Sequence, residues 1–500
     1  MWILSLVVGV FGPSVVALRM TTVVIGSLAC VAFFGATLAV ESRRGRGFAL
    51  CAAFVLCTLH WHSHFSRLVF TTNLVPLVAC GLVWTMAVAA RVKDNAIQRK
   101  GAWAVVGVLA GLGFYTYYSW YFFLPVIAVW FWALRPDDEG AVGGETGECA
   151  SNGSWRGDLL YLSAGAGLAI LPLLIHYILS PSDLTRRLEA LSLFSNGFTE
   201  GMRAVAGNLC DVVLMFFVRG DHVIKHNVAV QLAQSDPLYG KTGSPVFEPI
   251  WALLFVVGLV RAIVDCRSGG AQGRRSAAWL AWLICMSMPS VLSFTESANS
   301  LRNLGATPAV AWFVALGWWW CYQAVARHYR AARRQWVHIA LFVALVWGAA
   351  FQIYKAWILH PKVPELAREF SSLQINVARF CAPDPKGGVY FVPMSFYGHK
   401  TFEFFTLGRD DIRPLNPVEL LSRPEKGPAR DHLVLCTTLS SNYEMLCRHF
   451  PRGTVEKNAL VVRRLGEGPF AWIFRIPASD LVSRREAERE APSVQLIPEQ

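Results

Sequence analysis

The chain has 500 residues, of which 54% are hydrophobic and only 16% are charged, and its formal net charge is +12. Because an ordinary soluble domain carries about 25% charged residues, this composition excludes an average water-soluble protein. The Lys and Arg side chains lie in short loops between apolar runs rather than in one basic patch, which argues against a nucleic-acid partner.

Apolar runs follow one another through residues 1–360, and we expect about ten of them to form a mainly α, polytopic transmembrane helical bundle. The runs 15–40 and 68–90 are long enough to span a bilayer, which needs about 20 residues. The 19 Trp and 13 Tyr fit this interpretation, since amphipathic rings settle at the lipid–water boundary. The other runs are 1–11, 48–59, 102–113, 121–134, 159–178, 250–263, 277–292, 309–326 and 336–359.

The loops between these runs alternate in charge. The positive-inside rule places the set that is rich in Lys and Arg in the cytoplasm. That set comprises residues 41–46, 91–100, 267–275 and 330–334. The Gly-rich acidic segment 135–156 is expected to be a flexible loop on the same side. The other loops, the long mixed segment 181–247 and everything after His360 then face outward, as in a multi-pass protein of the cell (inner) membrane.

The sequence changes character after the last apolar run. Residues 361–482 mix short strand patterns with helical ones, which predicts a small extracytoplasmic α/β domain. Residues 483–500 are charged, and we expect them to be disordered. The expected helices are 364–380 and 444–450, and the expected strands are 388–393, 432–437, 459–464 and 470–476.

The twelve cysteines give no sign of a metal site, because no pair has metal-ligand spacing. Most of them lie inside apolar runs, where they are interpreted as small buried hydrophobes. Three others, Cys381, Cys436 and Cys447, lie in the C-terminal domain. One disulfide among these three stays open as an alternative.

Polar clusters in the outward loops are the candidate functional sites, since polar groups at membrane depth are costly and mark function. The first cluster holds His60, His62, His64 and Arg67. Alternating histidines can bind a metal, but no carboxylate lies beside them, so we assign no metal. The alternatives are a loop that touches lipid headgroups, or an Arg that grips a phosphate with histidines as donors or proton carriers.

Three further clusters follow along the chain. Asp221 lies two residues after Arg219, and we expect that Arg to neutralise it. Glu296 and Arg302 are interpreted either as a structural ion pair or as an Arg presented to an anionic substrate. The aromatic link of residues 115–120 fits an aromatic belt or a sugar-stacking surface.

The order of these motifs resembles glycosyltransferase family 39, in the GT-C class of membrane glycosyltransferases with the protein O-mannosyltransferases and aminoarabinose transferases. Each motif is short, and the specificity lies in their order and in the matching topology. The matching stretches are residues 11–19, 64–67, 111–117 with Pro125, 219–221 with 226–227, and 296–302 with Gly305 and Pro308. No nucleotide-binding or HExxH pattern is present.

The resemblance implies transfer of a sugar from a polyprenyl-phosphate carrier to a lipid, glycan or protein acceptor on the outer face of the membrane, with no cofactor. It implies that the carrier phosphate or substrate is bound by His64, Arg67, Arg302, Tyr115 and Tyr117. The chain begins at what corresponds to the family's second membrane helix, and its first 40 residues hold no Asp or Glu.

The family's acidic first outer loop is therefore not found in this chain, and the resemblance implies little activity for the chain alone. No catalytic base is assigned, and Glu296 and Asp221 are the weak candidates. Two other functions stay open. A transporter or flippase for lipids or glycolipids usually shows repeated halves and broken helices at the midplane, whereas this sequence shows no repeat and its polar clusters lie at the ends of the apolar runs. A non-catalytic subunit of an envelope glycosylation assembly would fit the missing carboxylates.

Overall fold

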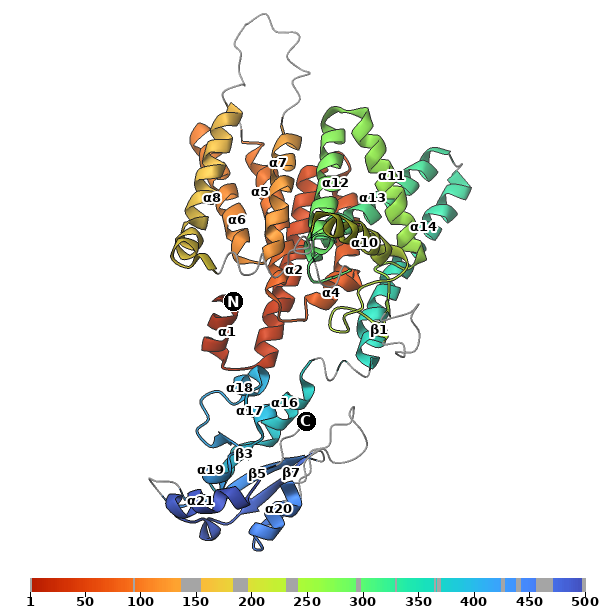
Figure 1. Ribbon diagram of the computed structural model, residues 1–500. Coiled ribbons are helices and arrows are strands. Elements are labelled where there is room, and N and C mark those ends of the chain that lie inside the picture. Colours follow the sequence, from red (N-terminus) through yellow and green to blue (C-terminus); the bar gives the residue numbers. More distant parts are fainter. Residues whose placement is uncertain are drawn as a thin grey trace, which may run out of the picture. The chain divides into compact units, whose positions relative to one another are not determined.

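The computed structural model describes residues 2–92, 95–135, 154–182, 197–230, 242–293, 298–328, 331–363, 366, 370–423, 428–437, 442–455 and 471–496. The chain divides into two compact units (Figure 1). The first unit comprises Met1–Val7 and Val16–Val363, and the second comprises Val8–Val15 and Pro364–Gln500.

The first unit is helical. Six of the described helices are long and apolar enough to cross a membrane, and two shorter apolar ones, Gly45–Thr58 and Tyr118–Ala133, accompany them. The helices are α1 (Trp2–Phe11), α2 (Val15–Val40), α3 (Gly45–Thr58), α4 (His60–Phe65), α5 (Leu74–Ala89), α6 (Ala96–Leu112), α7 (Leu124–Ala133), α8 (Ser154–Leu179), α10 (Phe198–Phe217), α11 (Pro249–Ser268), α12 (Gly270–Val291), α13 (Thr307–His328) and α14 (Ala331–Tyr354). The expected transmembrane helical bundle is confirmed.

The six long apolar segments are fewer than the ten or so runs expected from the sequence. They are Val15–Val40, Thr71–Ala89, Trp155–Leu179, Pro249–Ser268, Leu304–Arg327 and Gln335–Lys362. Helices α6 and α12 are not among them. Their first turns carry loop residues such as Arg99 and Arg274, which lower the mean hydropathy of the helix. The end of α14 continues as a π-helical turn, Lys355–Leu359, and then a 3-10 turn, His360–Lys362.

Close helix packing and stacked aromatic rings hold this unit together. Helices α11 and α13 approach so closely that a Cβ on Gly258 would lie 1.9 Å from the Phe313 carbonyl oxygen. Small residues permit such backbone approach between helices in a membrane. Trp279 stacks on Trp282 and on Trp312, with ring centroids 5.2 and 5.1 Å apart. All three rings are fully buried, and each aromatic pair adds about 0.5–1.5 kcal/mol beyond its buried area.

The two sets of loops lie at opposite ends of the helices. At one end Arg44 pairs with Glu41 and, at 3.2 Å, with Asp265, which joins the basic loop after α2 to the end of α11. At the other end the Trp61 indole N–H donates to the Ser300 carbonyl oxygen at 2.8 Å. The basic loops and the other loops therefore lie at opposite ends, as expected from the alternation of loop charge along the sequence.

The second unit is a small α/β fold, as expected from the sequence. Its sheet has the strand order β4-β3-β5-β7-β6. Strand β3 is parallel to β4 and β5, whereas β7 is antiparallel to β5 and β6. The strands are β3 (Val389–Val392), β4 (Ile412–Pro414), β5 (His432–Thr437), β6 (Thr454–Val455) and β7 (Ala471–Ile476), and the helices are α16 (Ser372–Phe380), α17 (Met394–Tyr397), α18 (Lys400–Phe405), α19 (Pro417–Leu421), α20 (Asn442–His449) and α21 (Arg484–Glu490).

The core of this unit lies on both faces of the sheet. Leu433 and Leu435 of β5 belong to the cluster on one face, and Val434 and Cys436 belong to the cluster on the other. Successive side chains of a strand point to opposite faces, so a central strand with helices on both sides is apolar throughout. The expected strand 459–464 lies outside the described residues.

The last segment of the chain differs from the expectation of disorder. Residues 484–490 form α21, whose N-terminus is closed by a reciprocal capping box between Ser483 and Glu486. Ala487 and Val494 are buried in the cluster behind β5. Two buried apolar side chains therefore anchor a segment whose charge alone suggests disorder. Cys381, Cys436 and Cys447 of this unit form no disulfide with one another.

Candidate functional site

The end of the helical unit opposite Arg44 and Asp265 is organised around α4. This helix has only six residues, because Leu59 leaves the helical conformation at φ −56° and ψ 119° and separates it from α3. The break turns the His-rich segment across the end of the bundle. The His60 backbone N–H donates to Gln352 Oε1 at 3.0 Å, and His64 Nε2 donates to the Lys225 carbonyl oxygen at 2.8 Å.

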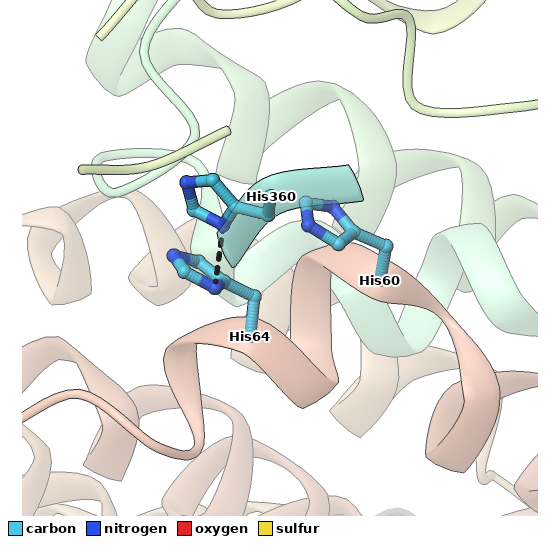
Figure 2. A group of neighbouring side chains, drawn as sticks. All are labelled: His60, His64 and His360. Atoms are coloured by element: carbon cyan, nitrogen blue, oxygen red, sulfur yellow. Dashed lines mark hydrogen bonds between the residues drawn. The ribbon is translucent and has the colours of Figure 1, made fainter. Parts of the chain in front are cut away.

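Three histidine rings meet beside α4 (Figure 2). The rings of His60 and His64 stack with centroids 5.4 Å apart, and the His360 ring lies 4.3 Å from that of His64. All three side chains are buried. Burial, with the nearby positive charges of Lys355 and Arg67, lowers the pKa of His60 well below its usual value. Burial also lowers the pKa of His64 well below its usual value. Both rings are therefore neutral at pH 7.

Asp221 is a buried hub and not the neutralised partner of Arg219 that the sequence suggests. Its side chain is 0% exposed and accepts three hydrogen bonds. They come from the Val223 N–H at 2.8 Å, His226 Nδ1 at 2.9 Å and the Ser300 N–H at 2.6 Å. This carboxylate holds two loops together, and its lone pairs are largely occupied.

Arg219 pairs instead with Asp211, at 2.6 Å on the surface of α10. The two residues are eight positions apart, and both side chains are partly exposed. The expected neutralisation of Asp221 by Arg219 is therefore wrong.

Arg67 is the predicted site residue with the most unusual surroundings. One guanidinium N–H donates to the Ala356 carbonyl oxygen at 3.2 Å, and the guanidinium carbon lies 4.1 Å from the centroid of the Trp357 ring. Its Nε–H is buried and has no hydrogen-bond partner. Burial and the charge of Arg19 lower the pKa of Arg67. In the part of the chain that the structure describes, no carboxylate pairs with it.

Arg302 lies in the loop before α13. Its backbone N–H donates to Asn299 Oδ1 at 3.0 Å, and its guanidinium contacts the Ser293 hydroxyl. The adjacent Ser300 contacts Trp61 of α4, so this loop belongs to the same end of the bundle as Arg67. Glu296, the expected alternative partner of Arg302, lies outside the described residues.

The aromatic link is divided between the core and the surface. Trp120 is fully buried and donates to the Ala110 carbonyl oxygen at 3.0 Å, so it belongs to the core. The Tyr115 hydroxyl donates to the Ala169 carbonyl oxygen at 2.9 Å and ties this link to α8. The Tyr117 and Tyr118 rings lie 4.2 Å apart, centroid to centroid.

A second buried polar group at this end was not predicted from the sequence, and it consists of Gln352 of α14, Glu248 before α11 and Lys355 of the π-helical turn. Gln352 donates to the Val246 carbonyl oxygen at 3.0 Å and to Glu248 Oε2 at 3.3 Å. Glu248 also caps α11 by accepting the Trp251 N–H at 2.8 Å, and burial raises its pKa. Lys355 is buried and donates to the Pro245 carbonyl oxygen. The signal was present, since Gln352 and Lys355 are polar residues inside an apolar run.

No protein-family model matches the sequence, and no curated protein matches it either. Among solved structures, ArnT from Cupriavidus metallidurans bound to undecaprenyl phosphate is similar with a TM-score of 0.51 and 12% identity, over 96% of this chain and 88% of that one. Apo ArnT from the same organism gives a TM-score of 0.46 and 11% identity, over 96% and 87%.

A third similar structure is the archaeal oligosaccharyltransferase AglB from Archaeoglobus fulgidus, in complex with an inhibitory peptide and a dolichol-phosphate. Its TM-score is 0.43 and its identity 12%, over 81% of this chain and 55% of that one. Only the first of these three structures has a TM-score above 0.5. The helical bundle with a small C-terminal α/β unit is a GT-C glycosyltransferase fold, as the resemblance implied.

Proposed function

We propose that this GT-C-fold chain is a membrane glycosyltransferase that moves a sugar from a polyprenyl-phosphate carrier to an acceptor at the outer face of the membrane. The similar ArnT structure holds undecaprenyl phosphate. The observation that carries the proposal is the guanidinium of Arg67, which is half-buried, has an unbonded Nε–H and has no carboxylate partner among the described residues.

An unneutralised Arg at the end of a membrane helix is suited to an anionic lipid. The planar fork of a guanidinium matches the oxygens of a phosphate, with two parallel hydrogen bonds. A polyprenyl tail needs apolar surface beside that fork. Trp357, which contacts Arg67, is 57% exposed, and Val69 and Ile358 are exposed as well. We infer that the carrier phosphate lies at Arg67 with its tail along these side chains.

Sugar transfer needs a cation at the carrier phosphate and a base for the proton of the acceptor. The acceptor oxygen or nitrogen attacks C1 of the sugar, the bond between C1 and the phosphate oxygen breaks, and the carrier phosphate leaves with both electrons. A cation at the phosphate stabilises the charge that grows there. The acceptor's proton needs a base. The lone pairs of Asp221 are occupied by three donors, so Glu296 stays the candidate.

Binding of the carrier is the direct test. The full chain in nanodiscs should bind undecaprenyl phosphate, and Arg67→Ala and Arg67→Lys should each weaken this binding by about 10- to 100-fold, because hydrogen bonds to charged groups are worth about 1.5–3 kcal/mol. Arg91→Lys is the matched control. Arg91 contacts the Ala39 carbonyl oxygen at the opposite end of the bundle, so this substitution should leave binding unchanged.

The same preparation tests transfer, with a panel of polyprenyl-phosphate sugars and with lipid, glycan and peptide acceptors. Carrier binding that is equally strong without Arg67 would overturn the proposed phosphate site. A second outcome is that binding depends on Arg67, the carrier moves between the leaflets and no sugar is transferred. This result would show that the chain is a lipid transporter and not a transferase.

A further inference from the structure

The buried histidine cluster has a hydrogen-bonding pattern that protein groups alone do not satisfy. His64 Nε2 lies 2.8 Å from the Lys225 carbonyl oxygen, and His360 Nε2 lies 2.8 Å from the Ile224 carbonyl oxygen. A carbonyl oxygen can only accept, so both Nε2 atoms carry a hydrogen and donate it. In a neutral ring the other nitrogen, Nδ1, then presents a lone pair.

The two Nδ1 atoms face each other at 3.2 Å (Figure 2). Two lone pairs at this distance repel each other, and a positively charged species between or beside the two Nδ1 atoms would remove this repulsion. The ring of His60 also has an unsatisfied nitrogen. His60 Nε2 is buried and has no hydrogen-bond partner, and a buried polar atom left unpaired costs about 1–3 kcal/mol.

The same three residues offer one ring nitrogen each, and these nitrogens all lie within 4.8 Å of one another. Zn²⁺ binds imidazole nitrogen at about 2.0–2.1 Å in tetrahedral geometry, which separates neighbouring ligand atoms by about 3.4 Å. The observed Nδ1–Nδ1 distance of 3.2 Å is close to that separation. His60 and His64 are also four residues apart on one helix, a spacing that puts two imidazoles on the same side for a metal.

We propose that His60, His64 and His360 bind a divalent transition-metal ion of the Zn²⁺ class, through His64 Nδ1, His360 Nδ1 and the unbonded Nε2 of His60. The Lys225 and Ile224 carbonyl oxygens fix the tautomers by accepting the two Nε2–H groups, as the outer partners of metal-bound histidines do. Three protein ligands leave a fourth position for water or another small oxygen ligand, which is the pattern of an open zinc site.

Neutral imidazoles suit this role, because a metal ion binds the lone pair and competes with the proton for it. The charged or titratable groups that act on the cluster are Arg67, Lys355 and His226. The cations among them oppose any positive charge here, whether it is a metal ion or a proton.

A single proton shared between His64 and His360 is the competing explanation. It removes the repulsion between the two Nδ1 lone pairs with one hydrogen bond. It leaves His60 Nε2 without a partner, however, and His60 is as deeply buried as the other two rings. A metal ion engages all three nitrogens, so it accounts for the whole cluster.

Metal content of the purified full-length protein tests the proposal without any activity assay. After chelation and dialysis, the protein in detergent should take up one equivalent of Zn²⁺ or Co²⁺, measured by elemental analysis. The Co²⁺ form should show the strong visible absorption of a tetrahedral site. His64→Ala and His360→Ala should each lower the affinity by more than about 100-fold, since even outer partners of metal ligands are worth about 10–100-fold.

His62→Ala is the matched control. His62 lies in the same helix and is equally buried, but its Nε2 contacts the Gly26 carbonyl oxygen at 3.2 Å and Cys30 Sγ at 3.5 Å. This variant should bind the metal as the parent chain does. Equal loss of metal in His62→Ala would overturn the proposal, as would the absence of a bound equivalent in the parent chain.

The parent protein alone decides the question if the variants fail to fold. Three nitrogen ligands give Co²⁺ visible absorption without the near-ultraviolet charge-transfer band of a thiolate ligand. A thiolate band would place the ion on the cysteines and refute the histidine site.

Discussion

Replacing Asp221 by Asn tests whether this carboxylate is a structural hub or a catalytic base. Asn has nearly the same shape, but one of its two terminal atoms is an NH₂ group that cannot accept a hydrogen bond. One rotamer turns this NH₂ toward the Ser300 N–H, and the other turns it toward the Val223 N–H. Either way a backbone donor that is buried or partly buried loses its acceptor, and the charge is lost.

The cost can be set from these contacts. A hydrogen bond to a charged group is worth about 1.5–3 kcal/mol, and a buried donor left unpaired costs about 1–3 kcal/mol. These two figures describe the same lost bond, so we expect Asp221→Asn to lower the free energy of unfolding by about 2–3 kcal/mol. His226 limits the damage, because it can move its proton to Nε2 and accept from the new NH₂.

Unfolding in mixed micelles by a denaturing detergent gives this quantity. Asp211→Asn is the control, because the Arg219–Asp211 pair is exposed to solvent and surface pairs are worth about 0–1 kcal/mol. If Asp221→Asn kept full stability while sugar transfer was abolished, the hub interpretation would be refuted and Asp221 would be the base.

Three further outcomes follow from the fold. A cysteine introduced at Pro385 should be labelled from outside the cell and one at Gly143 should not, since the positive-inside rule predicts that the basic loops lie in the cytoplasm. The reverse labelling would show that the topology is inverted. Gly258→Ala should destabilise the helical unit by about 1–3 kcal/mol, because the added Cβ forces α11 away from α13. Gly167→Ala should not destabilise it, since a Cβ there meets nothing within 4 Å. Equal stability of the two variants would contradict the close packing of α11 on α13. Burial lowers the pKa of His432 to about 4, so the unfolded chain binds a proton that the folded chain does not. The free energy of unfolding should therefore fall by up to about 3 kcal/mol as the pH drops from 6.5 to 4. Hydrogen exchange of β5 measures this loss, and His432→Gln should remove it.

The elements that carry a clear pattern were predictable. Strand β5 is apolar on both faces and was expected at the residues where it is found. Strand β4, Ile412–Pro414, was missed, because three residues that include Arg413 and a proline show no alternation. The helix α21 was missed for a different reason: its charges are visible in the sequence, whereas the burial of Ala487 depends on the rest of the fold.

In the site, too, features within one short segment were predictable, whereas contacts between distant segments were not. The four-residue spacing of His60 and His64 is visible in the sequence, but the third ring of the cluster is 296 residues from His64. The partner of Arg219 was assigned by nearness in sequence, and the structure pairs Arg219 with Asp211 of the preceding helix α10 instead. Contacts that close large loops have no periodic signal, so sequence patterns indicate the residue types and not their assembly.

The π-helical turn at residues 355–359 lies directly before the third histidine and contains one residue that a regular α-helix would not need. A π turn contains one residue more than an α turn, and such turns are frequent at functional sites. Each residue of an α-helix advances the chain by about 100° around the axis. Deleting one residue here, such as Ile358, should let the turn relax to α-helix and leave His360 in register with α4, whereas deleting one residue from the regular α-helix before it would rotate His360 by about 100°. In a comparison of related chains, a one-residue gap within these five positions is therefore compatible with the cluster, whereas a one-residue gap elsewhere in α14 is not.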